Sequence, residues 1–317
     1  MLIRFIQVER NAALLLIAAG LLGLASVNLF GASLISHEVS ELSHYLLCLF
    51  FFLVGLELKR ELTGGMFVKK KALVVPLLAA VFGAAIPALL YMLITRGDSQ
   101  AQSGWAIPMA TDITFALAVF GFFASRFRKE ARGFLLAFAI IDDILAIVVI
   151  AVFLGVPVLT GALVTGSALL GLFVPARFIS KLENFIHPLV AYIVLPLFAF
   201  TALALPIEIG VGAVVASAVG LGILLRVIGK VVGISFGAWL GVRITGISSG
   251  LRLLDYIHIS VLGGIGFTVS LLVTDLVFEK GSVQHSQAVV ASLLAALVSS
   301  VLATILFLSR KKSLTSL

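Results

Sequence analysis

The sequence predicts an all-α polytopic membrane protein, from its composition, its scarcity of charge and the length of its apolar runs. Of its 317 residues, 61% are hydrophobic and 12% are charged, whereas a soluble domain usually carries about 25% charged residues. Apolar runs of about 18 or more residues recur along the chain, and helices of that length span a hydrocarbon core of roughly 30 Å. A transmembrane β-barrel would alternate apolar and polar residues in segments of about ten, and no such alternation is present.

We predict about ten transmembrane helices, joined by connections too short for a soluble domain. The predicted spans are 11–30, 42–58, 72–95, 104–124, 133–154, 157–175, 187–206, 209–241, 256–278 and 286–308. The first span is too long and too rich in glycine for a typical signal peptide. The pair His187-Pro188 is predicted to start the seventh, because proline suits the first turn of a helix. The eighth is too long for one straight span.

Basic residues predict the orientation in the membrane. Eighteen of the 22 Lys and Arg residues lie at the two termini or in alternate loops, while the other loops contain only Arg96 and Lys280. The remaining two, Arg226 and Lys230, lie inside the eighth span. By the positive-inside rule both termini are cytoplasmic. Basic loops facing anionic lipid account for the net charge of +7, so no nucleic-acid partner is expected.

Two spans contain helix-breaking residues at corresponding places. The fourth reads "GWAIPMATDITFAL" (104–117) and includes Pro108, and the ninth contains "GGIGFTVSLL" (263–272), with three glycines close together. Each is the middle member of a group of three spans, 3–5 and 8–10. Interrupted segments in matching positions of two halves are typical of inverted repeats, in which the broken helices cross near the midplane.

Charged side chains inside these spans are the candidate site residues. They are Asp112, Asp142, Asp143, Arg226 and Lys230, and an Asp or Lys at a helix centre costs about 2.5–3.5 kcal/mol to insert. Asp142 and Asp143 diverge by about 100° on a helix. We therefore expect one to pair with Lys230 and the other to bind a cation from solution.

Asp112 has two interpretations that the sequence leaves open. If the fourth span breaks near Pro108 and Thr111, the N-terminus of a half-helix opens inside the membrane with about half a positive charge. Asp112 would compensate that charge, and Thr111 would satisfy freed backbone groups. Alternatively, Asp112 is itself a ligand of the transported ion.

The buried acids predict competition between a proton and a small cation. Removal from water raises the pKa of a carboxylate, which can then hold a proton near neutral pH. Na⁺ is a hard cation that favours the same oxygen atoms, so a sodium site is predicted at Asp142 and Asp143. If the site opens alternately to the two faces, each cycle exchanges one cation for the other. The chain contains no G-x-x-x-x-G-K-[ST] motif, and no cofactor is expected.

Several stretches resemble the NhaA-type sodium/proton antiporters. They are "FFLVGLELKREL" (51–62), "GWAIPMATDITFAL" (104–117), "LLAFAIIDDILAI" (135–147), "LENFIHP" (182–188), "LPLFAF" (195–200), "IGK" (228–230) and "GGIGFTVSLL" (263–272). The resemblance covers most of the chain. It implies a secondary transporter in the bacterial inner membrane that exchanges Na⁺ or Li⁺ for H⁺.

The resemblance also implies roles for individual residues. Asp143 would be the principal exchanging carboxylate, and Asp142 would join it and pair with Lys230 until the ion binds. Thr111 and Asp112 would lie where the interrupted helices cross. A pH-responsive cytoplasmic mouth would contain Glu57, Arg60, Glu61 and Glu183.

The chain departs from the family pattern in length. Ten predicted spans rather than twelve imply that two helices after the fifth span are missing. The short loop "GASLISHEVSE" lies between spans 1 and 2, where the family has its dimer-forming hairpin. The hairpin is therefore expected to be absent, and a homodimer is possible but is not predicted from this loop. The implied transport core is 72–154 with 209–308, and the implied interface helices are 11–58 with 157–206, all within one membrane domain, 1–317.

Three other functions are weighed against this exchange. A shortened member that folds but does not transport would keep the motifs and lack activity. A transporter that couples an ion gradient to another solute would need a larger recognition site, and none is visible. An intramembrane hydrolase would use two acids converging on one water, but the chain lacks the G-x-G-D signature of such proteases. We therefore expect no enzyme activity.

Overall fold

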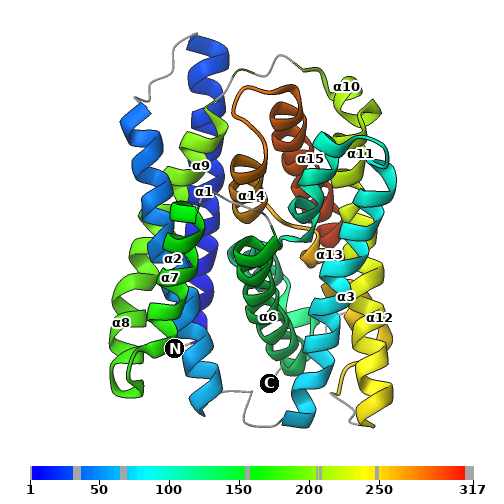
Figure 1. The fold of residues 1–317 in the computed structure, drawn as a ribbon. Coiled ribbons are helices and arrows are strands. Elements are labelled where there is room, and N and C mark those ends of the chain that lie inside the picture. The colour runs from blue at the N-terminus through cyan, green and yellow to red at the C-terminus, as the bar shows by residue number, and fades with distance from the viewer. Residues whose placement is uncertain are drawn as a thin grey trace. The chain divides into compact units, whose positions relative to one another are not determined.

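The computed structural model confirms an all-helical chain (Figure 1). It describes residues 2–30, 37–64, 70–153, 158–204, 206, 209–246 and 250–310, and no strand occurs among them. Within this part, six helices are long and apolar enough to cross a membrane, or eight if each of two bent helix pairs is one span. The protein is therefore a multi-pass membrane protein. Two further predicted spans, 42–58 and 157–175, coincide largely with the helices His37–Gly64 and Val158–Phe173, but they do not enter that count.

Two predictions fall outside the described residues. The predicted absence of a dimer hairpin concerns the loop after the first helix, residues 31–36. The predicted junction where two helices are missing lies at 154–157. Both stay predictions, as does the oligomeric state.

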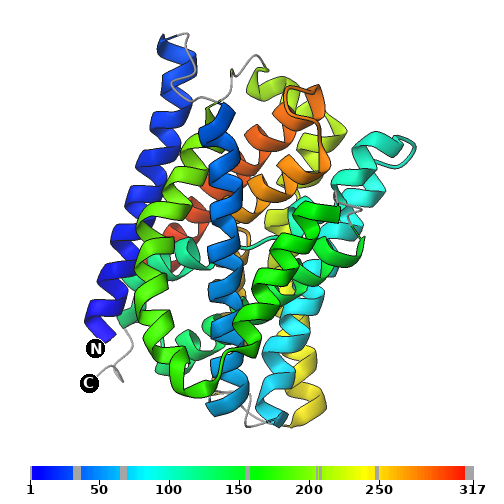
Figure 2. The same cartoon turned by 60° about the vertical axis from the view of Figure 1, so that its left-hand side comes forward.

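The chain divides into two compact units. The first contains Met1–Val68 and Ile147–Glu208, and the second contains Lys69–Ala146 and Ile209–Leu317. The helices of the first unit are α1 (Leu2–Phe30), α2 (His37–Gly64), α7 (Val158–Phe173), α8 (Ala176–Leu189), the π-helical segment η4 (Val190–Val194) and α9 (Leu195–Leu203). Figure 2 shows α1 running beside α9, and α2 packs on α7.

The predicted start of the seventh span at His187 is wrong. Helix α8 already begins at Ala176 and continues through Pro188, and the apolar stretch Ala176–Leu203 forms one span of 28 residues. Proline has no N–H for the helical hydrogen bond. A π-helical turn, η4, follows directly after Leu189. The charged residues around Lys181 lower the mean hydropathy of the first turns of this helix, so the prediction started the span too late.

The second unit contains the two interrupted spans and the helices that pack around them. These are α3 (Lys70–Ile94), α4 (Ser99–Gln102), the 3-10 helix η2 (Ser103–Met109), α5 (Ile113–Phe122), the 3-10 turn η3 (Ala124–Arg126), α6 (Lys129–Phe153), α10 (Val211–Ala216), α11 (Ala218–Leu224), α12 (Arg226–Thr245), α13 (Leu253–Gly263), α14 (Thr268–Val277) and α15 (Val283–Ser309). The long predicted span 209–241 breaks at Ser217, whose side chain accepts a hydrogen bond from Gly220 N at 3.0 Å. Ala218–Thr245 then forms the span.

Both predicted interruptions are confirmed. The stretch Ser99–Met109 meets Thr114–Phe122 at 45°, and Leu253–Gly263 meets Thr268–Val277 at 50°. Each break follows the helix-breaking residues of its motif, Pro108 in one and the glycines from Gly263 in the other. Matching interruptions in the two halves fit the predicted inverted repeat.

Helices α3 and α12 pack side by side over most of their length (Figure 1). A Cβ added at Gly233 would lie 2.3 Å from Phe82 O, and one at Gly237 would lie 2.2 Å from Leu78 O. Small residues at such positions let two helix backbones approach closely in a membrane. The backbone of α12 therefore rests directly on that of α3.

We expect Gly237→Ala to destabilise the folded protein by about 1–3 kcal/mol, the usual cost of overpacking. The added methyl meets a backbone oxygen of Leu78, which cannot rotate away. Gly212→Ala in α10 is the matched control, because nothing lies within 4 Å of its added Cβ. Thermal unfolding in detergent measures both. Equal unfolding midpoints for the two variants would contradict this account of the interface.

Candidate functional site

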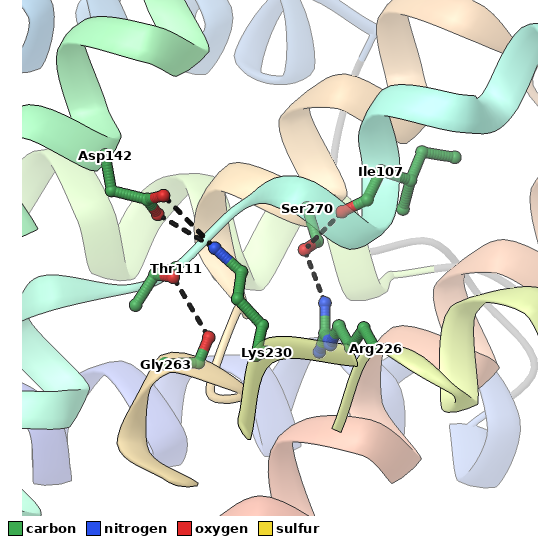
Figure 3. A network of polar contacts seen from close by, with 7 residues as sticks. All are labelled: Ile107, Thr111, Asp142, Arg226, Lys230, Gly263 and Ser270. Atoms are coloured by element: carbon green, nitrogen blue, oxygen red, sulfur yellow. Dashed lines mark hydrogen bonds and ion pairs between the residues drawn. The ribbon is translucent and has the colours of Figure 1, made fainter. Parts of the chain in front are cut away.

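The two interrupted helices cross through their extended connectors. Asp112 N donates a hydrogen bond to Ile265 O at 2.7 Å, and Thr111 Oγ1 donates to Gly263 O at 2.9 Å (Figure 3). A Cβ added at Gly266 would lie 2.2 Å from Ala110 O. Glycine is therefore needed at this crossing, and Thr111 satisfies a carbonyl at the end of α13.

One buried carboxylate caps both half-helices that leave the crossing. Asp112 Oδ1 accepts from Phe115 N at 3.2 Å in the first turn of α5. Its Oδ2 accepts from Thr268 N at 3.2 Å and from Thr268 Oγ1 at 2.6 Å, where α14 begins. An acid at a helix N-terminus satisfies free N–H groups and compensates the helix dipole. Of the two interpretations of Asp112, this geometry favours electrostatic support.

Lys230 and Asp142 form a buried ion pair (Figure 3). Lys230 Nζ on α12 donates to both carboxylate oxygens of Asp142 on α6, at 3.1 and 3.2 Å. The two side chains are 0% and 3% exposed, and Lys230 Nζ lies 5.9 Å from the ring centre of Phe138. The pair predicted between spans 5 and 8 is thus present in the second unit.

Asp143 is the second acid of this site. It is buried on α6 and follows Asp142, so it occupies a different face of that helix. It is near enough to Lys230 for the two charges to interact. The second unit therefore contains all five predicted residues of the ion site: Thr111, Asp112, Asp142, Asp143 and Lys230.

Arg226 lies one turn before Lys230 and is fully buried. Its Nη1 donates to Ser270 Oγ at 2.7 Å, and its Nη2 donates to Ser292 O at 2.9 Å. Ser270 Oγ in turn donates to Ile107 O at 3.2 Å (Figure 3). Sequence reasoning gave no role to Ser270 or Thr268. The only signal was their place in the first turn after a glycine-rich break, where hydroxyl groups commonly satisfy the backbone.

The residues of the predicted pH-responsive mouth lie in the first unit rather than with the carboxylates. Arg60 on α2 forms an ion pair with Glu183 on α8, and Glu57 is half-buried. The side chain of Glu61 lies outside the described residues. Arg60 is 42% exposed in this pair, and exposed ion pairs contribute little to stability. The pH role of these four residues stays a prediction.

A resident metal site is not visible in the described part of the chain. No group of three or more His, Cys, Asp or Glu residues there could hold a metal ion. Of the two buried carboxylates on α6, Asp142 already has a cationic partner within the protein.

Comparison with known proteins gives consistent matches over most of the chain. A family model described as Na⁺/H⁺ antiporter 1 matches residues 4–179 and 161–307. The chain is 32% identical to the Na⁺/H⁺ antiporter NhaA of Proteus mirabilis, with 87% of this chain and 88% of that protein covered. It is 35% identical to the NhaA of Frankia casuarinae, with 84% and 74% covered. The Proteus alignment extends over 348 residues, more than this chain contains, so that relative has residues without a counterpart here.

Proposed function

The chain belongs to the Na⁺/H⁺ antiporter 1 family, and we propose that Asp142 and Asp143 carry its exchange by binding Na⁺ (or Li⁺) and protons in turn. The exchange of sodium for protons follows from the family and from relatives that are named Na⁺/H⁺ antiporters. The lipid bilayer, Na⁺ and H⁺ are its partners. The part played by individual carboxylates and the alternation between the two faces are our proposal.

The buried ion pair is the observation that carries this proposal. Lys230 Nζ lies 3.1 Å from Asp142 Oδ2 in a buried site, and Asp143 adds a second buried acid beside it. A desolvated charge is stable only when it is compensated. When Na⁺ arrives, its charge substitutes for that of Lys230 at Asp142, and the pair separates. When Na⁺ leaves, protons and Lys230 compensate the acids again.

Alternating access requires that the carboxylates face each side of the membrane in turn. We propose that 72–154 with 209–308 moves as the transport core, because it holds the crossing and the ion pair. We propose that 11–58 with 157–206 is the interface against which it moves. This assignment is supported by the division of the chain into two compact units with similar boundaries.

The alternatives are not favoured. A shortened member that does not transport has no reason to retain two buried acids and a buried lysine, each of which destabilises an apolar helix. Coupling to another solute finds no support in the relatives, whose names specify Na⁺ and H⁺.

The experiment is a proton-flux assay in reconstituted vesicles. The protein is placed in vesicles with a pH-sensitive dye, a proton gradient is imposed, and NaCl, LiCl or KCl is added. We expect rapid dequenching with Na⁺ and Li⁺ and a much smaller response to K⁺. No response to any cation from folded protein would contradict the exchange and favour the shortened, inactive member.

We propose that the protein lies in the bacterial inner membrane with both termini in the cytoplasm. Support comes from the basic residues of the second unit that were predicted to be cytoplasmic. Arg126 donates to Leu308 O at 2.9 Å, and Arg128 donates to Gly250 O at 2.7 Å. Three such segments, before α6, before α13 and at the end of α15, are therefore at the same end of this unit. A C-terminal tag that protease removes from right-side-out vesicles would contradict this orientation.

A further inference from the structure

Arg226 is a buried cation without an acidic partner. Its side chain is fully buried, and no carboxylate of the described residues lies within ion-pair distance of its guanidinium. Its Nε has no hydrogen-bond partner among them either. Burial of an ionised group is strongly unfavourable unless something compensates the charge. A residue needed only for packing would be apolar, so the charge itself requires an explanation.

The groups that Arg226 contacts are a hydroxyl group, Ser270 Oγ, and a main-chain carbonyl, Ser292 O, rather than acids. Through Ser270 Oγ its Nη1 is linked to Ile107 O, at the end of the helical stretch Ser99–Met109. The C-terminal end of a helix carries about half a negative charge. That end is interrupted inside the membrane, so its carbonyl groups have no water to bind. Arg226 therefore compensates the C-terminal end of η2, as Asp112 compensates the N-terminal ends of α5 and α14.

Arg226 is also close to the exchange site. Arg226 and Lys230 are four residues apart on α12, a spacing that places two Cβ atoms about 5–6 Å apart. Figure 3 shows both side chains extending from α12 toward the crossing. The two positive charges interact. A change at Arg226 therefore acts on Lys230, and through it on Asp142.

We propose that Arg226 is a positioning residue for cation exchange, because it supplies a fixed positive charge that lets Lys230 leave Asp142 when Na⁺ binds. Without Arg226, Lys230 would be the nearest cation both to the C-terminal end of η2 and to the acids of α6. If Lys230 then moved away from Asp142, neither the helix end nor the acids would have a compensating charge. A guanidinium keeps its proton over the working pH range, whereas a buried ammonium can lose it. This inference rests on the proposed exchange at Asp142 and Asp143.

The fixed charge has a measurable consequence for the pH profile. Among the described residues, Lys230 on α12 is the charged group that interacts with Arg226, and the acids of α6 are reached through Lys230. Its hydrogen-bond partners on α14 and α15 are Ser270 Oγ and Ser292 O, and Ser270 Oγ leads on to Ile107 O of η2. A nearby positive charge disfavours the charged form of an amine. Removing it weakens the repulsion on the ammonium of Lys230, which then stays paired with Asp142 to higher pH, so Na⁺ displaces it only at higher pH.

The test uses two substitutions at this position in the vesicle assay. We expect Arg226→Met to move the pH of half-maximal Na⁺-driven flux upward by about one unit. At a fixed pH below that midpoint, the apparent KM for Na⁺ rises by up to about tenfold, while the maximal rate at high pH is retained. Arg226→Lys, which keeps the charge, stays near the wild-type profile. Arg243→Met is the matched control, because it removes an exposed arginine from the other end of the same helix.

Two results would overturn the proposal: an unchanged pH profile in Arg226→Met, or an equal shift in Arg226→Lys. A purely structural role would lower the yield or the rate of both variants without moving the profile. If Arg226→Met does not fold, Arg226→Gln keeps amide donors and removes the charge, and the same upward shift is expected. If the wild-type protein shows Na⁺-driven flux, the proposed exchange stands even when the Arg226 variants do not behave as expected. Failure of this inference is therefore distinguishable from failure of the proposed function.

Discussion

Asp143→Asn is expected to reduce Na⁺-driven proton flux to the level of protein-free vesicles. The amide has nearly the shape of the carboxylate, but it neither binds a proton at working pH nor offers a negative charge to Na⁺. Asp143 is buried on α6, and the substitution removes a buried charge without opening a cavity. We therefore expect folded protein at wild-type yield together with lost exchange, measured by the dye assay and by gel filtration of the same sample.

The control for this loss is an equivalent change outside the site. Glu279→Gln also replaces an acid by its amide, at an exposed position that follows α14. We expect it to exchange at the wild-type rate. Retained sodium-dependent flux in Asp143→Asn, with a wild-type cation preference, would assign the exchange to other groups.

Breaking the Lys230–Asp142 pair is expected to have the largest effect on stability. Removing one partner of a buried ion pair leaves an uncompensated charge and costs about 3–5 kcal/mol, whereas replacing both by apolar residues is often neutral. We expect Lys230→Met and Asp142→Leu each to lower the thermal unfolding midpoint strongly. The double variant should be more stable than either single variant and should still fail to exchange Na⁺ for H⁺.

An ion pair with an exposed cation provides the comparison. Lys280 lies 3.5 Å from Asp275, and the two side chains are 52% and 3% exposed. Lys280→Met should change the unfolding midpoint little, because Asp275 keeps its contact with His285 at 2.8 Å and an exposed partner contributes about 0–1 kcal/mol. Additive losses in the Lys230→Met/Asp142→Leu variant would show that the two residues are not energetically coupled.

The positions of the breaks and of the ion pair were predictable because each depends on a few residue types that can be recognised in the sequence itself. Proline removes a helical hydrogen bond, and Pro108 and the glycines from Gly263 mark the two breaks, although Pro76 and Pro87 lie inside α3. Charged residues are rare in membrane spans. Lys230 was therefore the obvious partner for one of two adjacent acids. The ion pair required no knowledge of loops or of the exact helix ends.

The remaining features depend on contacts between distant parts of the chain. Asp112 reaches Thr268 across 156 residues, and hydroxyl residues are too common in these helices to identify Thr268 in advance. Pro188 lies inside α8, which ends directly before the π-helical segment Val190–Val194. Local sequence specifies neither arrangement, since both are selected by the helices that pack around them.

The sharing of Asp112 between two half-helices limits how this protein can move. Its carboxylate holds the first turn of α5 with one oxygen and the first turn of α14 with the other. Sliding one half-helix past the other would strand amide and hydroxyl hydrogens in a region without solvent. If the protein works by the alternating access proposed above, we therefore expect the four helical segments that meet at the crossing to move as one rigid body.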